Sequence, residues 1–566
     1  MRMESWLAVG VILGFFLALS GVDAADRPTS KLVYPAADGK LTYQAYSAQG
    51  DTIPDFSNCG YGGGGVLLPD VPVRVTVQPE AGSGDDRARL QAAIDQVAAM
   101  PTDGDGFRGA VVLRRGLYRL SKPLDIRASG IVVRGEGSDE KGTVLLGTGK
   151  KIFALISVSG PAKPRGVTIS RHEIIDAYAP VGGRSFHVAD AAGIGVGDTV
   201  FVVRHGNADW IHYIGMDHIK PRPANPSSTR QWKPFDLKFD RVVTAIEGSR
   251  ITVDAPIACA VDARWGGDEI VKFSDTRIEH VGVERLRADS TFDPGVTAKL
   301  GRKSYASDED HAHFLVSFDS VKNAWVRDVV TTHMYHGVAL FGRNSKWITA
   351  QDSAALDPVS EITGGRRYPF NIEGQLILVQ RCYAREARHA FAVGARVPGP
   401  NVFLDCLADR SYNTSEPHQR WSVGGLFDNV QAQMAIQDRQ WMGSGHGWAG
   451  ANYVVWNSSG SLVCQRPPTA QNFSIGFTGK KRKGAFPRPD GYWESEGIHV
   501  SPRSLYLAQL QERLGSRAVA QTTTPAERTG EVAAVQAALR AMAGASRDLG
   551  PDTAEPDAAN ADDDGQ

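Results

Sequence analysis

The sequence is poor in cysteine, in charge of one sign and in long hydrophobic runs, and each shortage excludes a class of protein. Five cysteines in 566 residues are too few for a disulfide framework in a chain of this length. A formal net charge of -1 gives no overall basic footprint for nucleic acid, although a localised basic surface stays open. Beyond the N-terminal segment, no apolar run is long enough to span a membrane.

The N-terminus has the pattern of an export signal. Arg2 precedes an apolar run from Trp6 to Leu19, and the small-residue motif Val22-Asp23-Ala24 follows. The run is short for a membrane span of about 20 residues, and no cysteine follows to accept lipid, which disfavours the alternative of an uncleaved anchor. We therefore expect residues 1–24 to be a signal peptide and the mature protein to be secreted or periplasmic.

What the sequence does contain is a short strand pattern that returns four times: WVRDVVT from Trp325, WITAQDS from Trp347, LVQRCYA from Leu378 and VFLDCLA from Val402. Registered on Val326, Ile348, Val379 and Phe403, the steps are 22, 31 and 24 residues. Such a period predicts a β-solenoid, in which each coil buries its apolar face against its neighbours. Cys382 and Cys406 share one position in the repeat, which predicts stacked core thiols instead of a bridge.

Upstream of the repeats, the sequence predicts a helix and three strands. Leu90, Ala93, Ile94 and Val97 follow Asp85-Asp86 at helical spacing, and strands are expected at 109–113, 116–120 and 131–136. The run Leu90-Gln91-Ala92-Ala93-Ile94-Asp95, with GAVVLRRGLYRL and IVVRGEG, resembles the entry to pectate-lyase-like right-handed parallel β-helix proteins. The resemblance implies an all-β fold with an N-terminal capping helix, in a superfamily that includes lyases, glycoside hydrolases, epimerases and phage tailspikes.

The expected organisation has five parts. They are the signal peptide (1–24), the cap and first coils (25–173), a small inserted β module (174–260), the main β-helix with its groove (261–500), and a C-terminal helix with a disordered acidic tail (501–566). Alternating apolar and polar residues in three segments of 174–260 predict antiparallel strands that break the coil pattern. The run from Asp209 to Tyr213 in this module is expected either to touch substrate or to pack on the solenoid.

Titratable residues recur at one corner of successive coils. His336, Tyr368, His389, His418 and His446 are spaced by 32, 21, 29 and 28 residues. Because adjacent coils lie about 4.8 Å apart, these side chains are expected to form a column. Further arginines near this column include Arg385, Arg396 and Arg410. The alternative is a structural ladder of stacked side chains, for which His336 and His446 are the strongest candidates.

An Arg, His and Tyr set suits β-elimination from a uronic acid, which requires carboxylate neutralisation, proton removal and protonation of the departing oxygen. We expect Arg367 and Arg388 to hold the carboxylate, and His389 to act as the base. Tyr368 is expected to be the acid, or a shared acid and base, and His418 and Arg420 to complete the catalytic set. The predicted substrate-binding residues are Arg366, Asn371, Glu373, Tyr335, His336, Glu416, Trp421 and Trp448, the tryptophans as aromatic platforms.

Other interpretations stay open on the sequence alone. A glycoside hydrolase needs two carboxylates flanking the bond, for which Glu373, Glu416 and Asp428 are candidates. A non-catalytic glycan-binding solenoid is the third possibility. The run from Asp308 to His313 supplies few of the oxygens that Ca²⁺ prefers, so a solvated turn is favoured there and a calcium requirement is left open. No cofactor is predicted with certainty. The expected partner is an anionic polysaccharide, and the oligomeric state is left open.

Overall fold

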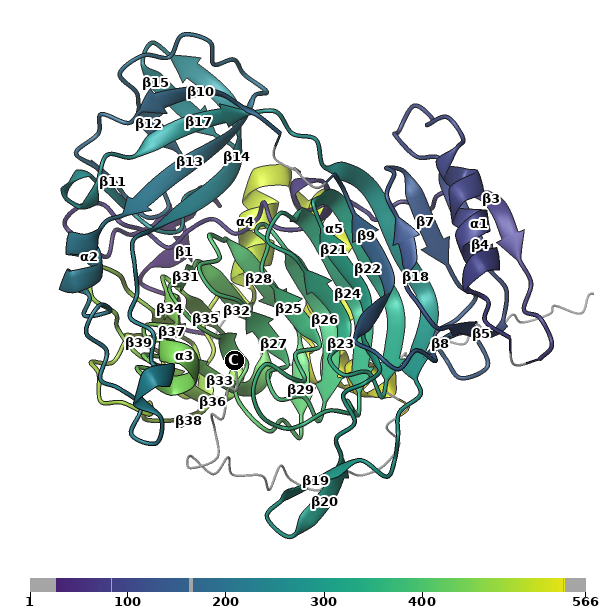
Figure 1. The fold of residues 1–566 in the computed structure, drawn as a ribbon. Helices are drawn as coiled ribbons and strands as arrows, with labels where there is room; N and C mark the ends of the chain where they lie inside the picture. The colour runs from purple at the N-terminus through teal and green to yellow at the C-terminus, as the bar shows by residue number, and fades with distance from the viewer. Residues whose placement is uncertain (1–26, 83, 162–165, 543, 545–566) are drawn as a thin grey trace, which may run out of the picture.

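The computed structural model describes residues 27–82, 84–161, 166–542 and 544. The predicted signal peptide lies outside the described residues, as does residue 543 and the acidic end from 545 onward. Figure 1 shows stacked parallel strands running across the molecule, with a separate small sheet above one end. None of the helices in the described ranges combines the length and hydrophobicity needed to cross a bilayer.

One face of the stack is a seven-stranded parallel sheet. Its strands, in spatial order, are β6 (Leu124–Ile126), β9 (Phe153–Ser159), β21 (Ala312–Asp319), β23 (Gly337–Phe341), β25 (Phe370–Ile372), β27 (Phe391–Val393) and β30 (Glu416–Pro417). Neighbouring strands come from successive coils, as the parallel pairing of Phe370 with Phe391 shows. This sheet is called the site sheet below.

The remaining faces are formed by long strands that bend in the middle. These are β18 (Ile278–Ser290), β22 (Val321–Thr332), β24 (Lys346–Leu356) and β26 (Leu378–Arg385). At each bend one residue has left-handed backbone geometry: Arg285, Asp328, Asp352 and Arg381, with φ between 48° and 56°. A single left-handed residue turns the strand without ending its pairing, so one strand contributes to two faces.

Shorter strands complete these two faces at both ends of the stack. Before β18 they are β3 (Val73–Val77), β4 (Gly109–Leu113), β5 (Gly116–Leu120), β7 (Ile131–Arg134) and β8 (Thr143–Gly147). After β26 they are β28 (Asn401–Leu404), β29 (Leu407–Asp409), β32 (Gly425–Asp428), β33 (Gln431–Ile436), β35 (Val454–Trp456), β36 (Ser459–Cys464), β37 (Phe473–Ile475), β38 (Thr478–Lys481) and β39 (Tyr492–Glu494). Parallel pairing between successive coils makes the strands from β3 to β9 and from β21 to β39, together with β18, a parallel β-helix.

The predicted register is wrong by two residues at one coil. Val326 pairs with Ala350, Ala350 with Val379, and Val379 with Phe403, so the steps are 24, 29 and 24 residues. Ile348 instead pairs with Ala324. Because side chains alternate with a period of two, a two-residue slip leaves Ile348 on the core face. The error therefore changes the coil lengths but not the identity of the buried face.

The thiol prediction is confirmed. The pairing of Tyr383 with Leu407 places Cys382 beside Cys406 on consecutive coils, and all five cysteines are buried and free. Burial raises the pKa of the Cys382 thiol well above its usual value, and the neighbouring Cys406 adds to the shift. These thiols are therefore unreactive parts of the core.

Helix α1 (Arg87–Ala98) lies at the N-terminal end of the stack, beside β3 and β4 (Figure 1). Its buried residues Leu90, Ile94 and Val97 join the main hydrophobic core. Asp86 begins the helix and accepts a hydrogen bond from the backbone N–H of Arg119, which ties the helix to β5. Helical spacing in the sequence thus corresponds to a helix that packs against the first coils.

The segment between β9 and β18 forms a six-stranded antiparallel sheet. Its order is β10 (Thr168–Glu173), β17 (Glu269–Phe273), β13 (Thr199–Gly206), β14 (Phe235–Glu247), β15 (Arg250–Val253) and β12 (Ser185–His187). The sheet extends beyond the expected limits of 174–260 on both sides, because β10 and β17 pair with each other. Smaller elements nearby are β11 (Tyr178–Ala179), β16 (Val261–Asp262) and α2 (Ala208–Tyr213).

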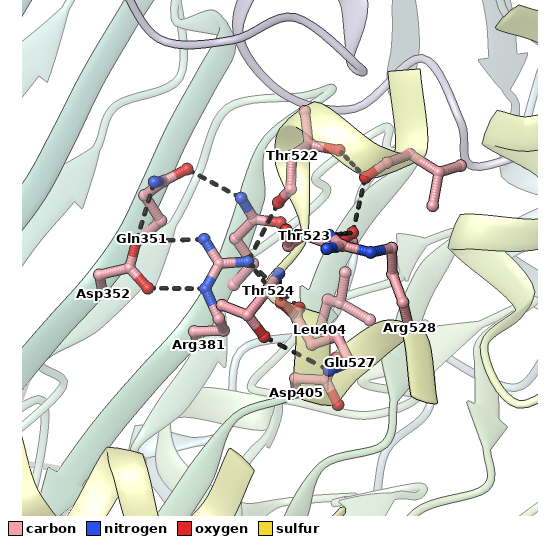
Figure 2. Close-up of polar contacts among 12 residues, drawn as sticks. Gln351, Asp352, Arg381, Leu404, Asp405, Thr522, Thr523, Thr524, Glu527 and Arg528 are labelled. Atoms are coloured by element: carbon pink, nitrogen blue, oxygen red, sulfur yellow. Dashed lines mark hydrogen bonds and ion pairs between the residues drawn. The ribbon is translucent and has the colours of Figure 1, made fainter. Parts of the chain in front are cut away.

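The C-terminal segment contains four helices where the sequence indicated one clearly. They are α4 (Leu505–Leu514), α5 (Ser516–Thr522), α6 (Pro525–Thr529) and α7 (Val532–Met542). Figure 2 shows Arg381, at a strand bend, held between Asp352 of the previous coil and Glu527 of α6. Leu505 and Leu510 pack against Leu378 and Val454 on the outside of the coils. The helices therefore cover a side of the solenoid.

Candidate active site

The predicted column of titratable side chains is present at the site sheet. Tyr368 and His389 precede paired strands, and their ring centroids are 4.9 Å apart. His418, one coil further, lies 4.8 Å from His389, and His446 lies 4.9 Å from His418. His336 is 5.9 Å from Tyr368 at the other end. These separations match the coil spacing, because each ring comes from a different turn of the solenoid.

Tyr368 lies at the centre of the column. Its hydroxyl accepts a hydrogen bond from Arg388 Nη1 at 3.0 Å and lies 3.3 Å from His418 Nε2 and 3.2 Å from the Gly364 carbonyl. Arg388 also donates to the Gly364 carbonyl. Tyr368 is 7% exposed, so its phenol is almost fully enclosed by protein. A hydroxyl between a guanidinium and an imidazole can both receive and release a proton.

Glu416 connects two histidines of the column. Its Oε1 lies 2.9 Å from His418 Nδ1 and 3.4 Å from His389 Nδ1. Arg439 Nη1 donates to the same oxygen at 2.9 Å and to the His418 carbonyl at 2.8 Å. A buried carboxylate held in this way fixes the His418 ring and leaves His418 Nε2 facing Tyr368. Arg439 was not singled out from the sequence, since it belongs to a later coil and no motif surrounds it.

His389 is the candidate base of the column, and its Nε2 is enclosed by protein. It is fully buried, and its Nδ1 donates to the Thr414 carbonyl at 2.5 Å. That bond fixes the tautomer with the lone pair on Nε2, which has no hydrogen-bond partner among the described residues. Burial lowers the pKa of His389 well below its usual value, with Glu416 opposing the shift and Arg388 adding to it. The imidazole is therefore neutral near pH 7 and able to accept a proton.

Two groups among the described residues are close enough to share a metal ion. One is His212, Asp217 and His218 on the exposed surface; the other is His389, Glu416 and His418, whose ligand atoms lie within 4.8 Å of one another. In the second group, Arg439 Nη1 lies 2.8 Å from His418 Nδ1 and already supplies a positive charge. Neither group approaches the six to eight oxygens that Ca²⁺ takes. Neither of these two groups therefore fits a calcium site.

The Asp308 segment forms a turn, as expected. The Asp308 carboxylate accepts hydrogen bonds from the backbone N–H groups of Asp293 and Asp310. His311 is fully buried, and its ring nitrogens contact Ser290 Oγ at 3.0 Å and the Val359 carbonyl at 2.8 Å. These contacts make His311 part of the structural support of the turn.

Two of the predicted arginines are directed away from the column. The Arg367 guanidinium donates to the Ser360 carbonyl and lies 5.5 Å from the rings of Tyr305 and Tyr412. Arg366 forms a two-pronged ion pair with Glu309, at 2.8 and 3.1 Å. Because these contacts hold the Arg367 guanidinium away from the column, the assignment of this side chain to a substrate carboxylate is wrong in this geometry. Both arginines instead hold the loop that carries Tyr368.

His336 and Tyr335 support the column from one side. The His336 ring stacks on Phe314 at 4.5 Å, and its Nδ1 accepts a hydrogen bond from the backbone N–H of Tyr368 at 3.1 Å. The Tyr335 ring lies 4.6 Å from His336 and is 8% exposed. Burial lowers the pKa of His336 well below its usual value, so this ring is a neutral acceptor that positions Tyr368.

The predicted aromatic platforms are wrong. Trp421 and Trp448 are 0% and 2% exposed, and both belong to the hydrophobic core shared by the solenoid and the antiparallel sheet. Trp421 packs edge-on against Trp210 of α2, with ring centroids 5.0 Å apart. The sequence could not reveal this, because α2 lies about 200 residues upstream of Trp421 in the chain. The two tryptophans attach the antiparallel sheet to the coils.

Arginines also gather where site-sheet strands end. The backbone N–H of Arg396 donates to the Arg420 carbonyl, and the Arg420 guanidinium binds Ser444 Oγ at 2.8 Å. Neither arginine forms an ion pair with a carboxylate in the described part of the chain. Burial, with repulsion from Arg396 and Arg230, lowers the pKa of Arg420 to about 10. We call Arg396 and Arg420 the arginine pair.

The remaining predicted residues flank this pair. Asn371 is half-buried on the site sheet, paired with Ala392, and Ala392 in turn pairs with Glu416. Glu373 lies one position beyond β25 and 3.6 Å from Arg343, which the sequence analysis did not single out. Arg343 also lowers the pKa of Arg396, after the larger effect of burial. Polar and charged side chains therefore continue from the site sheet toward the arginine pair.

Comparisons with known proteins assign no family. No protein-family model matches the chain, and no curated protein matches its sequence. Solved structures with some likeness include ORF18 of Geobacillus virus E2, at 10% identity and a TM-score of 0.37, covering 75% of this chain and 59% of that one. An alginate lyase from Paenibacillus sp. has 9% identity and a TM-score of 0.32 over 75% of this chain and 99% of its own. An endo-xylogalacturonan hydrolase from Aspergillus tubingensis has 11% identity and a TM-score of 0.32, covering 75% of this chain and 100% of its own.

Proposed function

We propose that this protein is an exported enzyme that cleaves an acidic polysaccharide by β-elimination. The observation that carries the proposal is the pairing of a neutral, buried base with a phenol. His389 presents an Nε2 without a hydrogen-bond partner in the described chain, and the Tyr368 hydroxyl contacts Arg388 and His418. An acid and a base held next to each other on a rigid sheet suit removal of one proton and delivery of another.

The proposed reaction uses each of these groups once. A uronate bound across the site sheet gives its C5 proton to His389 Nε2, and the electron pair forms the C4–C5 double bond as the C4–O bond breaks. The Tyr368 hydroxyl protonates the departing oxygen, and water restores both groups. Arg388 stabilises the phenolate by its 3.0 Å hydrogen bond, while the Glu416–His418 pair takes part in reprotonation of Tyr368.

The arginine pair supports an anionic substrate. Arg396 Nε is buried without a hydrogen-bond partner in the described part of the chain, and its guanidinium lies 4.4 Å from the Phe235 ring. After the larger effect of burial, the charge of Arg396 lowers the pKa of Arg420, and an anion bound to both arginines would offset this repulsion. Guanidinium groups match carboxylate geometry. We propose that Arg396 and Arg420, rather than Arg367, neutralise the substrate carboxylate.

A hydrolase is the second candidate. Asp428 is removed from the possible carboxylate pairs, because it is fully buried and accepts hydrogen bonds from Ser504 and from the backbone N–H of Tyr506 at α4. Glu373 and Glu416 are left, but Glu416 is occupied by His418 and Arg439. A carboxylate held by two cationic or hydrogen-bonding partners is a poor general acid, so β-elimination is favoured.

The proposal also includes roles for helix α1, the antiparallel sheet and the N-terminal segment. We propose that α1 acts as a cap over the exposed strand edge of the first coil, which would otherwise pair with another chain. The antiparallel sheet from Thr168 to Phe273 is proposed to be an inserted module that walls one side of the groove. Residues 1–24 are proposed to direct export.

The experiment is a panel of acidic and neutral polysaccharides incubated with the purified mature protein. We expect oligosaccharides with an unsaturated, ultraviolet-absorbing end from at least one uronate polymer, and none from neutral polymers. New reducing ends without that absorbance would show hydrolysis. Binding without any product, at protein concentrations far above those used for turnover, would show a non-catalytic solenoid.

A further inference from the structure

A second pocket opens where the antiparallel sheet meets the solenoid, away from the column. Its volume is about 410 Å³, within the range of small-molecule sites. Strand β13 contributes Arg204, the N-terminal segment contributes Tyr46, and the rim includes Tyr213 and Trp265. None of the column residues lines it. Neither the proposed reaction nor the comparisons account for this pocket.

Arg204 is a buried cation without a counter-ion at contact distance. It is 3% exposed, and its Nη1 is buried without a hydrogen-bond partner among the residues that the structure describes. Its guanidinium lies 4.0 Å from the Trp210 ring, and it forms no ion pair in the part of the chain that the structure describes. Burying an unpaired guanidinium costs free energy, so an anion that enters the pocket would gain a strong, charge-assisted contact.

The carboxylates near this pocket are already satisfied. Asp51 accepts hydrogen bonds from the Tyr178 hydroxyl, Ser47 Oγ and the Val181 N–H. Asp262 is held by Arg264 at 3.0 Å. Another buried carboxyl, Asp268, accepts from the His205 N–H, and burial raises its pKa to about 6. Among the described residues, Arg204 has no acidic partner at hydrogen-bond distance, although its charge lowers the pKa of Asp262 and opposes the rise at Asp268.

A second unused donor and an aromatic rim complete the pocket. The Tyr46 hydroxyl is buried without a hydrogen-bond partner among the described residues. At the opening, the rings of Tyr213 and Trp265 lie 5.2 Å apart, and Tyr213 is 62% exposed. Exposed aromatic rings beside polar groups offer an apolar face to the C–H groups of a sugar ring, while the buried donors can bind its oxygens.

From these features we propose that the pocket is a second, non-catalytic binding site for an acidic sugar, with the sugar carboxylate on Arg204 and Tyr46 and the ring against Tyr213 and Trp265. This inference rests on the proposed function, because the acidic sugar would belong to the same anionic polymer that the column is proposed to cleave. Occupation of the pocket does not depend on turnover at the column. The site would hold part of a long substrate while another part is cleaved, or hold a released fragment.

The test is titration calorimetry of the mature protein with a uronate monosaccharide, a neutral sugar of the same ring size, acetate and inorganic phosphate. We expect the uronate to bind more tightly than the other three. Arg204→Lys and the double variant Tyr213→Ala/Trp265→Ala should each weaken this binding at least tenfold, or about 1.4 kcal/mol. Arg250→Ala, which removes an exposed arginine on the same sheet, is the matched control and should bind as the wild type.

Variants elsewhere separate this proposal from the proposed function. Arg396→Ala/Arg420→Ala removes the arginine pair, so uronate binding at the pocket should persist while polymer cleavage falls. Arg204→Lys should keep turnover of short substrates. Circular dichroism checks that the rim variant, Tyr213→Ala/Trp265→Ala, is folded. If the folded rim variant binds uronate with unchanged affinity, the sugar site is overturned, even if Arg204→Lys fails to fold. Equal binding of phosphate and uronate, insensitive to the rim variant, would also overturn it.

Discussion

Replacement of Tyr368 by phenylalanine tests the proposed reaction most directly. The change removes one oxygen that contacts Arg388 Nη1 at 3.0 Å and His418 Nε2 at 3.3 Å, and leaves the ring in place. Arg388 keeps the Gly364 carbonyl as an acceptor. The loss of hydrogen bonding should lower the free energy of unfolding by about 1–3 kcal/mol, a fraction of the roughly 5–15 kcal/mol of a typical domain.

The effect on the reaction should be much larger than the effect on folding. Loss of a general acid lowers kcat by about 10²–10⁴-fold, which raises the activation barrier by about 3–5 kcal/mol. The assay is the initial rate of unsaturated product formation on the polymer that the panel identifies, with circular dichroism and a urea titration on the same preparation. KM should change little, because the phenol is assigned to proton transfer rather than to carboxylate binding.

The matched control is Tyr383→Phe. Tyr383 is 0% exposed, and its hydroxyl donates to Asp409 at 3.2 Å on the side of the solenoid covered by α7. This variant should lose a similar amount of stability and keep its turnover. If Tyr368→Phe retains kcat within a few-fold of wild type, or if both variants lose activity equally, the assignment of Tyr368 to proton transfer is refuted.

Three further outcomes follow from named contacts. Burial lowers the pKa of His389, so this base stays deprotonated below the usual histidine pKa of about 6.5. The acid limb of the kcat/KM profile should therefore lie below about pH 6.5 and should be absent from the residual activity of His389→Ala. An acid limb above about pH 6.5 in the wild type would contradict this. Arg381→Ala should lower the free energy of unfolding, measured by urea titration, by about 3–5 kcal/mol, because it removes the cation paired with the buried Glu527 carboxylate. A loss below about 1 kcal/mol would contradict the structural role of this pair. Trp421→Ala should lower the free energy of unfolding by about 3–5 kcal/mol, because this side chain is fully buried, and should leave KM for a short substrate unchanged. A raised KM in a variant that stays stable would show that Trp421 binds substrate as an aromatic platform.

The coils were predictable because their contacts repeat along the chain. Each strand of the solenoid pairs with the strand about one coil away, so the apolar pattern around Val326 and Val379 records the neighbour directly. The error at Ile348 has the same origin. Alternation determines which face of a strand is buried, but it does not determine which of two inward-facing residues pairs with a given residue on the next coil. Helix α1 was visible in the spacing of its own apolar residues.

The site was predicted only in part. His389, His418 and Tyr368 were found because they occupy comparable positions before or after short strands of successive coils. Arg439 and its contact with Glu416 were not predicted. Such a contact between buried side chains depends on their rotamers and on which loop closes over them. Arg367 and Arg388 lie on successive coils, where the Arg388 backbone N–H donates to the Arg367 carbonyl, and they have the same chemistry. Only Arg388 reaches the Tyr368 hydroxyl.

The sequence by itself determined that this chain forms a stacked parallel solenoid with a helix near its entry and a non-repeating β segment within it, because periodicity and alternation are local properties. Only the tertiary structure decided that Trp421 is buried against Trp210, that Arg367 binds its own loop, and that Arg204 lies unpaired in a pocket between two sheets. These features depend on surfaces that meet across hundreds of residues, and burial at such contacts leaves no periodic trace in the chain.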